Sequence, residues 1–186
     1  MSEGDSPTGL LREEHRSILR VLHVLEVLLD RGESGDWDFD TLDDSIAFFR
    51  LFADACHHGK EEGLLFPELE ARGMPREGGP IGVMLTEHQI GRAFVAQMGR
   101  SLERSRRGDA DEVARLAHAG RGYITLLRNH ILKEDNVLFN MADQLLAGPA
   151  CRRLCDDYHA VCARHYEGRS KAELERLAAE LETRIA

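Results

Sequence analysis

Residues that could bind a metal ion recur in this chain at one fixed spacing. The stretches HHGKEEGLLF at 57–66 and HILKEDNVLF at 130–139 share the pattern His-x-x-Lys-Glu-acid-x-aliphatic-Leu-Phe. A Glu-His pair at 14–15 returns at 87–88, so it repeats with the same offset as the two stretches. Such an internal repeat indicates a repeated structural unit. It supplies six candidate metal ligands: His15, His57, Glu61, His88, His130 and Glu134.

The types and spacing of these residues favour a centre with two metal ions. A His and a Glu four positions apart on a helix differ in direction by about 40°, so both can reach one point beside it. Imidazole together with carboxylate suits iron, manganese or zinc better than calcium or magnesium. Four imidazoles and two carboxylates suit two ions, each bound by two histidines, with both glutamates and an oxide or hydroxide as bridges. The repeat then predicts a pseudo-two-fold axis between the ions.

The alternative for any one of these histidines is an ordinary core or surface residue. Four histidines in register on helix faces, two of them followed by Glu at the fourth position, are not explained in that way. Carboxylates in a dry core are also costly unless a cation neutralises them. The pattern therefore favours metal binding.

Hydrophobic spacing predicts helices along the whole chain and no strand. Apolar residues recur at intervals of three and four, and the four histidines fall on these apolar stripes. Pro67 removes a backbone donor near the end of the second helix and should kink or loosen it. The expected helices span residues 10–29, 39 or 41 to 72, 81–106, a fourth stretch between the breaks at 107–109 and 147–149, and 150–185.

These elements predict an all-α fold, an antiparallel up-down four-helix bundle with an additional C-terminal helix. Residues 10–147 are expected to form the bundle and residues 148–186 a helical extension packed on it. Residues 1–9 are expected to form a disordered lead. Because the apolar stripes of such a bundle face a common axis, the six candidate ligands should meet there.

Size and composition narrow the class of protein further. A chain of 186 residues with 42% hydrophobic and 31% charged residues suits one soluble domain. Its net charge of −9 argues against nucleic acid or an anionic membrane as the partner. No stretch resembles a signal peptide or approaches a membrane span. Four cysteines in a chain of this size do not suggest a disulfide scaffold, so the expected location is cytoplasmic.

The motifs resemble those of the hemerythrin-like HHE cation-binding domain over residues 10–147. They are EHR at 14–16, HxxKEE at 57–62 with LFP at 65–67, EHxxGR at 87–92, and HxxKE at 130–134. The resemblance implies a hemerythrin-like four-helix bundle that holds a non-haem di-iron centre through the six candidate residues. The two iron ions would be bridged by oxide or hydroxide.

One position departs from the oxygen-carrying members of that family. The carriers have a fifth histidine one turn along the third helix, where this chain has Arg92, and a cationic side chain cannot bind iron. The carriers also bridge through an Asp five residues after the fourth-helix histidine. Asp135 stands at that offset but points about 140° from His130, so Glu134 is the better ligand. The chain therefore resembles the six-ligand branch, associated with nitric oxide or peroxide stress, iron–sulfur cluster repair, and oxygen or iron sensing.

The function implied by the resemblance is binding of, or reaction with, a small oxidant. The expected partner is a diatomic molecule or peroxide: O2, peroxide or nitric oxide. Whether the protein is an enzyme that consumes peroxide or nitric oxide is left open. A sensor or carrier without turnover and a helical interaction module with a structural metal are the alternatives.

Several neighbours of the candidate ligands have less certain roles. His58 and Glu62 point about 100° away from the ligand beside each and are expected at the surface or in hydrogen bonds to ligands. Tyr123 is expected as a core residue whose hydroxyl could also reach the metal pocket. Arg92 could pair with a buried carboxylate or guard the pocket.

A second metal site is conceivable in the C-terminal segment. Cys151, Cys155 and His159 step by four along the expected helix, with Cys162 and His165 nearby. Nothing else in that segment completes a tetrahedral zinc site. The favoured interpretation is a helix face packed on the bundle, with Cys acting as a small hydrophobic residue.

Overall fold

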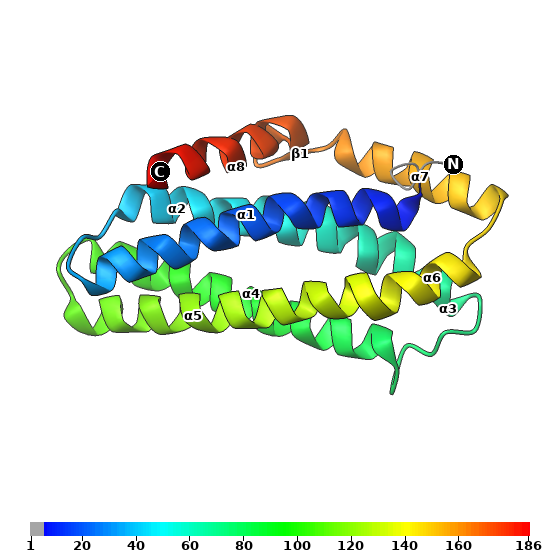
Figure 1. Ribbon diagram of the computed structural model, residues 1–186, viewed down its shortest axis with the longest axis horizontal. Coiled ribbons are helices and arrows are strands. Elements are labelled where there is room, and N and C mark those ends of the chain that lie inside the picture. Colours follow the sequence, from blue (N-terminus) through cyan, green and yellow to red (C-terminus); the bar gives the residue numbers. More distant parts are fainter. Residues whose placement is uncertain (1–5) are drawn as a thin grey trace.

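The computed structural model describes residues 6–186 and is almost entirely helical. Four long helical rods run side by side, and two shorter helices lie along one side of them (Figure 1). The first and third rods are α1 (Pro7–Glu33) and α4 (Pro80–Ser105). The second rod comprises α2 (Phe39–Phe48), η2 (Phe49–His58), η3 (Glu61–Leu65) and α3 (Phe66–Glu70). The fourth comprises α5 (Ala110–Lys133), η4 (Glu134–Leu138) and α6 (Phe139–Leu145).

Among the described residues, no helix is both long and apolar enough to cross a membrane.

Side-chain caps define where the rods begin. The Ser6 hydroxyl accepts a hydrogen bond from the Gly9 amide at 3.0 Å, and Pro7 follows in the first turn, where its missing N–H costs nothing. Asp38 and Asp109 cap α2 and α5 in the same way. The expected disordered lead is therefore wrong for residues 7–9, because this cap starts α1 at Pro7. Residues 1–5 of that lead lie outside the described residues.

Three segments of the second and fourth rods are π-helical. They are η2, η3 and η4, and the histidine–glutamate motifs lie in or beside them. A π-type turn takes in one residue more than an α-turn, so it changes which side chains face inward, and such turns are common at functional sites. Pro67 lies two positions after the last residue of η3, in the part of the rod that was expected to be kinked or loosened.

Two apolar clusters fill the interior, and a layer of buried polar residues separates them along the rods. The larger cluster includes Leu22 and Phe52, and the smaller includes Phe66 and Phe139. Along each rod, the candidate ligands lie between residues of one cluster and residues of the other. The fold thus places a polar layer within a dry core.

The C-terminal segment differs from the single helix expected there. It forms α7 (Pro149–Cys162), a hairpin of β1 (His165–Tyr166) and β2 (Arg169–Ser170), and α8 (Lys171–Ile185). Both residues of the hairpin turn have positive φ, 51° for Glu167 and 84° for Gly168, as a two-residue turn of this kind requires. The expectation of no strand is therefore wrong. A Ser170 capping box then starts α8, whose apolar face joins the larger cluster.

Candidate metal centre

The six candidate ligands converge in the polar layer. Each of these residues is at most 1% exposed. They come from all four rods: His15 from α1, His57 and Glu61 from η2 and η3, His88 from α4, and His130 and Glu134 from α5 and η4. The structure therefore brings together all the residues that the repeat singled out.

Their donor atoms form two adjacent sets. One set comprises His15, His57, Glu61 and Glu134, and the other comprises His58, Glu61, His88 and His130, with the donor atoms of each set within 4.8 Å of one another. The Nε2 atoms of the two histidines from α1 and η2 are 3.1 Å apart, and so are those of the two histidines from α4 and α5. Such spacing between nitrogens suits ligands that point at a shared ion.

Each glutamate lies close to histidines of both sets. Glu134 places Oε2 at 3.2 Å from His15 Nε2 and Oε1 at 3.2 Å from His130 Nε2. Glu61 places Oε1 at 3.5 Å from His57 Nε2 and Oε2 at 3.5 Å from His88 Nε2. Each carboxylate thus offers one oxygen to each set, which is the arrangement that a bridging ligand needs.

The carboxylate oxygens also test whether a cation fits here. All four oxygens of Glu61 and Glu134 are buried and have no hydrogen-bond partner. Burial and the neighbouring charge of Glu134 raise the pKa of Glu61, whereas His130 and His15 lower the pKa of Glu134 against the effect of burial. Unpartnered buried carboxylates are costly, and a bound cation would remove that cost. The donor set therefore fits a metal centre.

A ring of acidic residues fixes the orientation of the four imidazoles. Each histidine Nδ1 contacts a carboxylate, which leaves Nε2 directed at the centre. The contacts are His57 with Glu14 at 3.0 Å, His130 with Glu87 at 3.0 Å, His15 with Asp135 at 2.9 Å and His88 with Glu62 at 2.7 Å. Each of these pairs has its counterpart in the other copy of the repeat, so the repeat extends to the residues that support the ligands.

The electrostatic environment differs between the two halves. Burial lowers the pKa of His57 to about 4 despite its contact with Glu14. Burial also opposes protonation of His130, but the adjacent charge of Glu134 and a hydrogen bond to Glu87 raise its pKa to about 9. Hydrogen bonds from His57 and Lys60 lower the pKa of Glu14 to about 2, against burial. The pKa values of His15 and His130 are raised and those of His57 and His88 are lowered, so each half combines one of each, and histidines that correspond in the repeat shift in opposite directions.

His58 lies inside the centre, and its expected place away from the metal ligands is wrong. It is 4% exposed, and its ring stacks on His88 at a centroid distance of 3.8 Å. Its Nδ1 contacts Asp54 at 3.4 Å, whereas its buried Nε2 has no partner and belongs to the second donor set. The expectation assumed an α-helix throughout, but η2 is π-helical, so two successive residues face the interior.

This fifth histidine breaks the symmetry of the repeat. The position equivalent to His58 in the second copy is Ile131, which cannot bind a metal. Arg92 occupies the place of the third-helix histidine and instead contacts Asp54 and Glu62, each at 2.7 Å. Arg92 thus forms an ion pair, but its partners are partly exposed carboxylates and not the buried one expected. Glu62 supports a ligand, which is one of its two expected roles.

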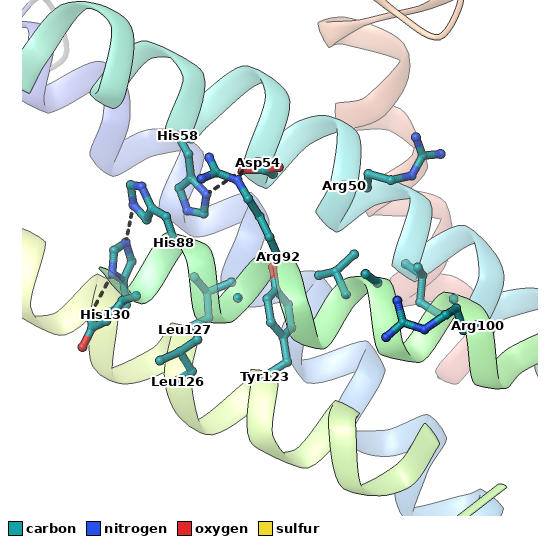
Figure 2. Close-up of a pocket in the computed structure, with 16 residues that line it drawn as sticks. Arg50, Asp54, His58, His88, Arg92, Arg100, Tyr123, Leu126, Leu127 and His130 are labelled. Atoms are coloured by element: carbon teal, nitrogen blue, oxygen red, sulfur yellow. Dashed lines mark hydrogen bonds and ion pairs between the residues drawn. The ribbon is translucent and has the colours of Figure 1, made fainter. Parts of the chain in front are cut away.

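A cavity of about 380 Å³ opens beside the second donor set (Figure 2). His58, His88 and His130 line one end, and Arg92 and Tyr123 lie farther along the cavity. Tyr123 is 2% exposed and packs edge-on against Phe49 at 4.9 Å, so it has the expected core role and also borders the cavity. Neither histidine of the first set lines this cavity, so the cavity meets the centre on the side of the second set.

The C-terminal cysteines do not form the second metal site that is conceivable from their spacing. Among residues 6–186, Cys151, Cys155 and His159 make no set of three donors close enough for one ion. Cys151 is buried, in agreement with a packing role. Instead, Cys162 lies near Cys56 and Glu14, a grouping that sequence spacing did not indicate because Cys56 belongs to the second rod.

A paired histidine–glutamate centre enclosed by helical rods is typical of helical metal-binding proteins. Residues 6–142 match the model of the hemerythrin HHE cation binding domain, and the chain belongs to that family. It is 25% identical over 154 residues to the uncharacterized protein Rv1995 of Mycobacterium tuberculosis and to the uncharacterized protein Mb2018 of Mycobacterium bovis. The match covers 82% of this chain but only 59% of each relative. No solved structure gives a significant match.

Proposed function

We propose that the four rods form an antiparallel up-down bundle that holds two iron ions and binds or reacts with a small oxidant. The observation that carries the proposal is the position of Glu61 and Glu134, each with one unpartnered buried oxygen toward each set of histidines. A pair of bridging carboxylates needs two ions, since a single ion would satisfy only half of these oxygens.

The histidines would divide unequally between two bound ions. His15 and His57 would hold one ion, and His88, His130 and His58 would hold the other. Three imidazoles and two carboxylate oxygens exceed the four ligands that a structural zinc site takes, and the mixture of nitrogen and oxygen donors suits iron. When bound, iron would supply redox chemistry and open coordination positions for a small ligand.

The chain's own residues define how a small oxidant would approach. The surface that lines the cavity is mostly apolar, with Val95 and Leu127 contributing to it, although charged residues and histidines also border it, and the cavity meets only the second donor set. Its volume of about 380 Å³ admits a ligand of a few atoms, because a water molecule occupies only about 30 Å³. Tyr123 offers a hydroxyl that could donate a hydrogen bond to a bound ligand. Burial raises the pKa of Tyr123, which keeps this donor protonated.

Metal content and ligand reactivity test the proposal together. Anaerobic loading with ferrous iron should give two ions per chain, and O2, peroxide or nitric oxide should then change the absorption spectrum. Steady consumption of the ligand identifies an enzyme, whereas a reversible spectral change without turnover identifies a sensor or carrier. Binding of one ion, or of none, would refute the two-ion centre.

Two matched variants on α4 test whether ligands reach the centre through the cavity. Ala96 lines the cavity and Ala93 does not, although neither is buried. Ala96→Trp should slow the reaction with peroxide while leaving two ions bound, and Ala93→Trp should have no effect on the rate. Equal rates for both variants would show that ligands reach the centre by another route.

A further inference from the structure

Two cysteines from distant parts of the chain meet outside the metal centre. Cys56 lies in η2 and is 0% exposed, whereas Cys162 is the last residue of α7 and is partly exposed. Their Sγ atoms lie within 4.8 Å of each other, and both thiols are free. A disulfide requires an S–S distance of about 2.05 Å, so a modest movement of the end of α7 or of the side chains would join them.

Lys60 gives this pair a positively charged environment. Its Nζ lies 3.7 Å from Cys162 Sγ and also donates a hydrogen bond to Glu14. The Lys171 Nζ lies 3.5 Å from the same Glu14 oxygen that Lys60 contacts. Cys56, Cys162 and Glu14 could in principle bind a metal ion, but the buried ammonium of Lys60 among them opposes a cation. The same ammonium favours a thiolate.

Cys162 is the more reactive of the two thiols. A hydrogen bond from Cys56 and the charge of Lys60 lower the pKa of Cys162 to about 6, against burial. Cys162 lies at the C-terminal end of α7, where the helix dipole disfavours a negative charge, so these groups stabilise the thiolate against the dipole as well. A cavity of about 580 Å³ reaches Cys162, Lys60 and Lys171, but Cys56 does not line it. A reagent from solvent therefore meets Cys162 first, with Cys56 behind it.

We infer that Cys162 and Cys56 form a redox-active pair that reduces a hydroperoxide independently of the metal centre. The Cys162 thiolate attacks the outer oxygen, the O–O bond breaks, and the leaving alkoxide or hydroxide takes a proton, which leaves a sulfenic acid on Cys162. The Cys56 sulfur then attacks the Cys162 sulfur, and the hydroxyl group departs as water with the Cys56 proton. The two thiols lose two electrons in total, one hydroperoxide becomes an alcohol or water, and an external thiol restores the pair.

The test uses the full chain treated with hydrogen peroxide, both as isolated and after metal removal with a chelator. Peptide mass mapping should show a Cys56–Cys162 disulfide in both samples, and a thiol reductant should reverse it. Cys56→Ser should leave a sulfenic acid on Cys162 that a dimedone probe labels. Cys162→Ser should abolish both products.

A variant with both other cysteines replaced, Cys151→Ser with Cys155→Ser, should form the disulfide at the wild-type rate. A disulfide that forms only in the metal-containing sample would overturn direct reaction of Cys162 with peroxide. The inference is also overturned if Cys155 is oxidised faster than Cys162, or if Cys56→Ser yields no labelled sulfenic acid while circular dichroism shows a folded protein.

Discussion

The internal repeat allows one ion pair to be tested against its own counterpart. Glu14 accepts hydrogen bonds from Lys60 and His57, and Glu87 accepts the equivalent bonds from Lys133 and His130. The environments differ, because the Lys60 side chain is 1% exposed whereas that of Lys133 is 40% exposed. The Lys60 ammonium lies over the ring of Tyr158 from α7 at 5.7 Å, so the C-terminal extension covers this pair. The same substitution should therefore have very different consequences in the two copies.

Glu14→Gln should destabilise the metal-free protein strongly. Glutamine retains the shape and an acceptor for His57 but removes the charge that neutralises Lys60. Breaking a buried ion pair by removing one partner costs about 3–5 kcal/mol, because the other charge remains buried. At about 2–4 °C per kcal/mol for a chain of this size, the midpoint of thermal unfolding should fall by about 6–20 °C. Glu87→Gln should cost no more than about 1 kcal/mol, since Lys133 can turn to solvent.

Thermal and urea unfolding in excess chelator measure both variants without any contribution from bound metal. Adding Lys60→Met to Glu14→Gln should recover most of the lost stability, because replacing both partners of a buried pair by uncharged groups is often close to neutral. Equal losses for Glu14→Gln and Glu87→Gln, or no recovery in the double variant, would refute the argument that burial of Lys60 sets the cost.

Three further outcomes are expected. Glu61→Ala should remove at least one bound ion and lower thermal stability with metal present, whereas Glu62→Ala removes only a hydrogen bond to a ligand and should weaken metal binding by about 10- to 100-fold. A metal titration in which Glu62→Ala loses more metal than Glu61→Ala would contradict the assignment of Glu61 to the inward face. His58→Ala should weaken the binding of one ion by about tenfold or more and alter the absorption spectrum of the metal-loaded protein. The control His23→Ala, at an exposed position, should change neither, and identical titrations for the two variants would remove His58 from the ligand set. The thiolate fraction rises with pH and is one half at the pKa, so alkylation of Cys162 should reach half its maximal rate near pH 6. A midpoint near the ordinary thiol pKa of about 8.5 would contradict this.

The internal repeat alone predicted which six residues would meet. One shared offset relates chemistry on four helices, and that relation does not depend on the details of packing. Helical spacing also placed the rods within a few residues of their observed bounds, because apolar stripes and capping residues are local signals. The same offset relates the acidic residues that orient the imidazoles, so these supporting residues were present in the repeat as well.

Features that depend on contacts between distant segments were not predictable. Placing His58 inside the centre depends on π-type turns in the second rod, which the spacing rules of an α-helix do not describe. The hairpin between α7 and α8 has strands of only two residues, too short to leave an alternating pattern.

The sequence by itself determined a repeated metal-ligand set on amphipathic helices, because residue type and local spacing specify both. Only the tertiary structure decided how the two halves of that repeat differ. The C-terminal extension buries Lys60 and brings Cys162 to Cys56, while Lys133 stays partly exposed. The cavity opens on the half that contains His58 and not on the other. These differences arise because burial, access and charge depend on which segments pack together, and no local pattern carries that information.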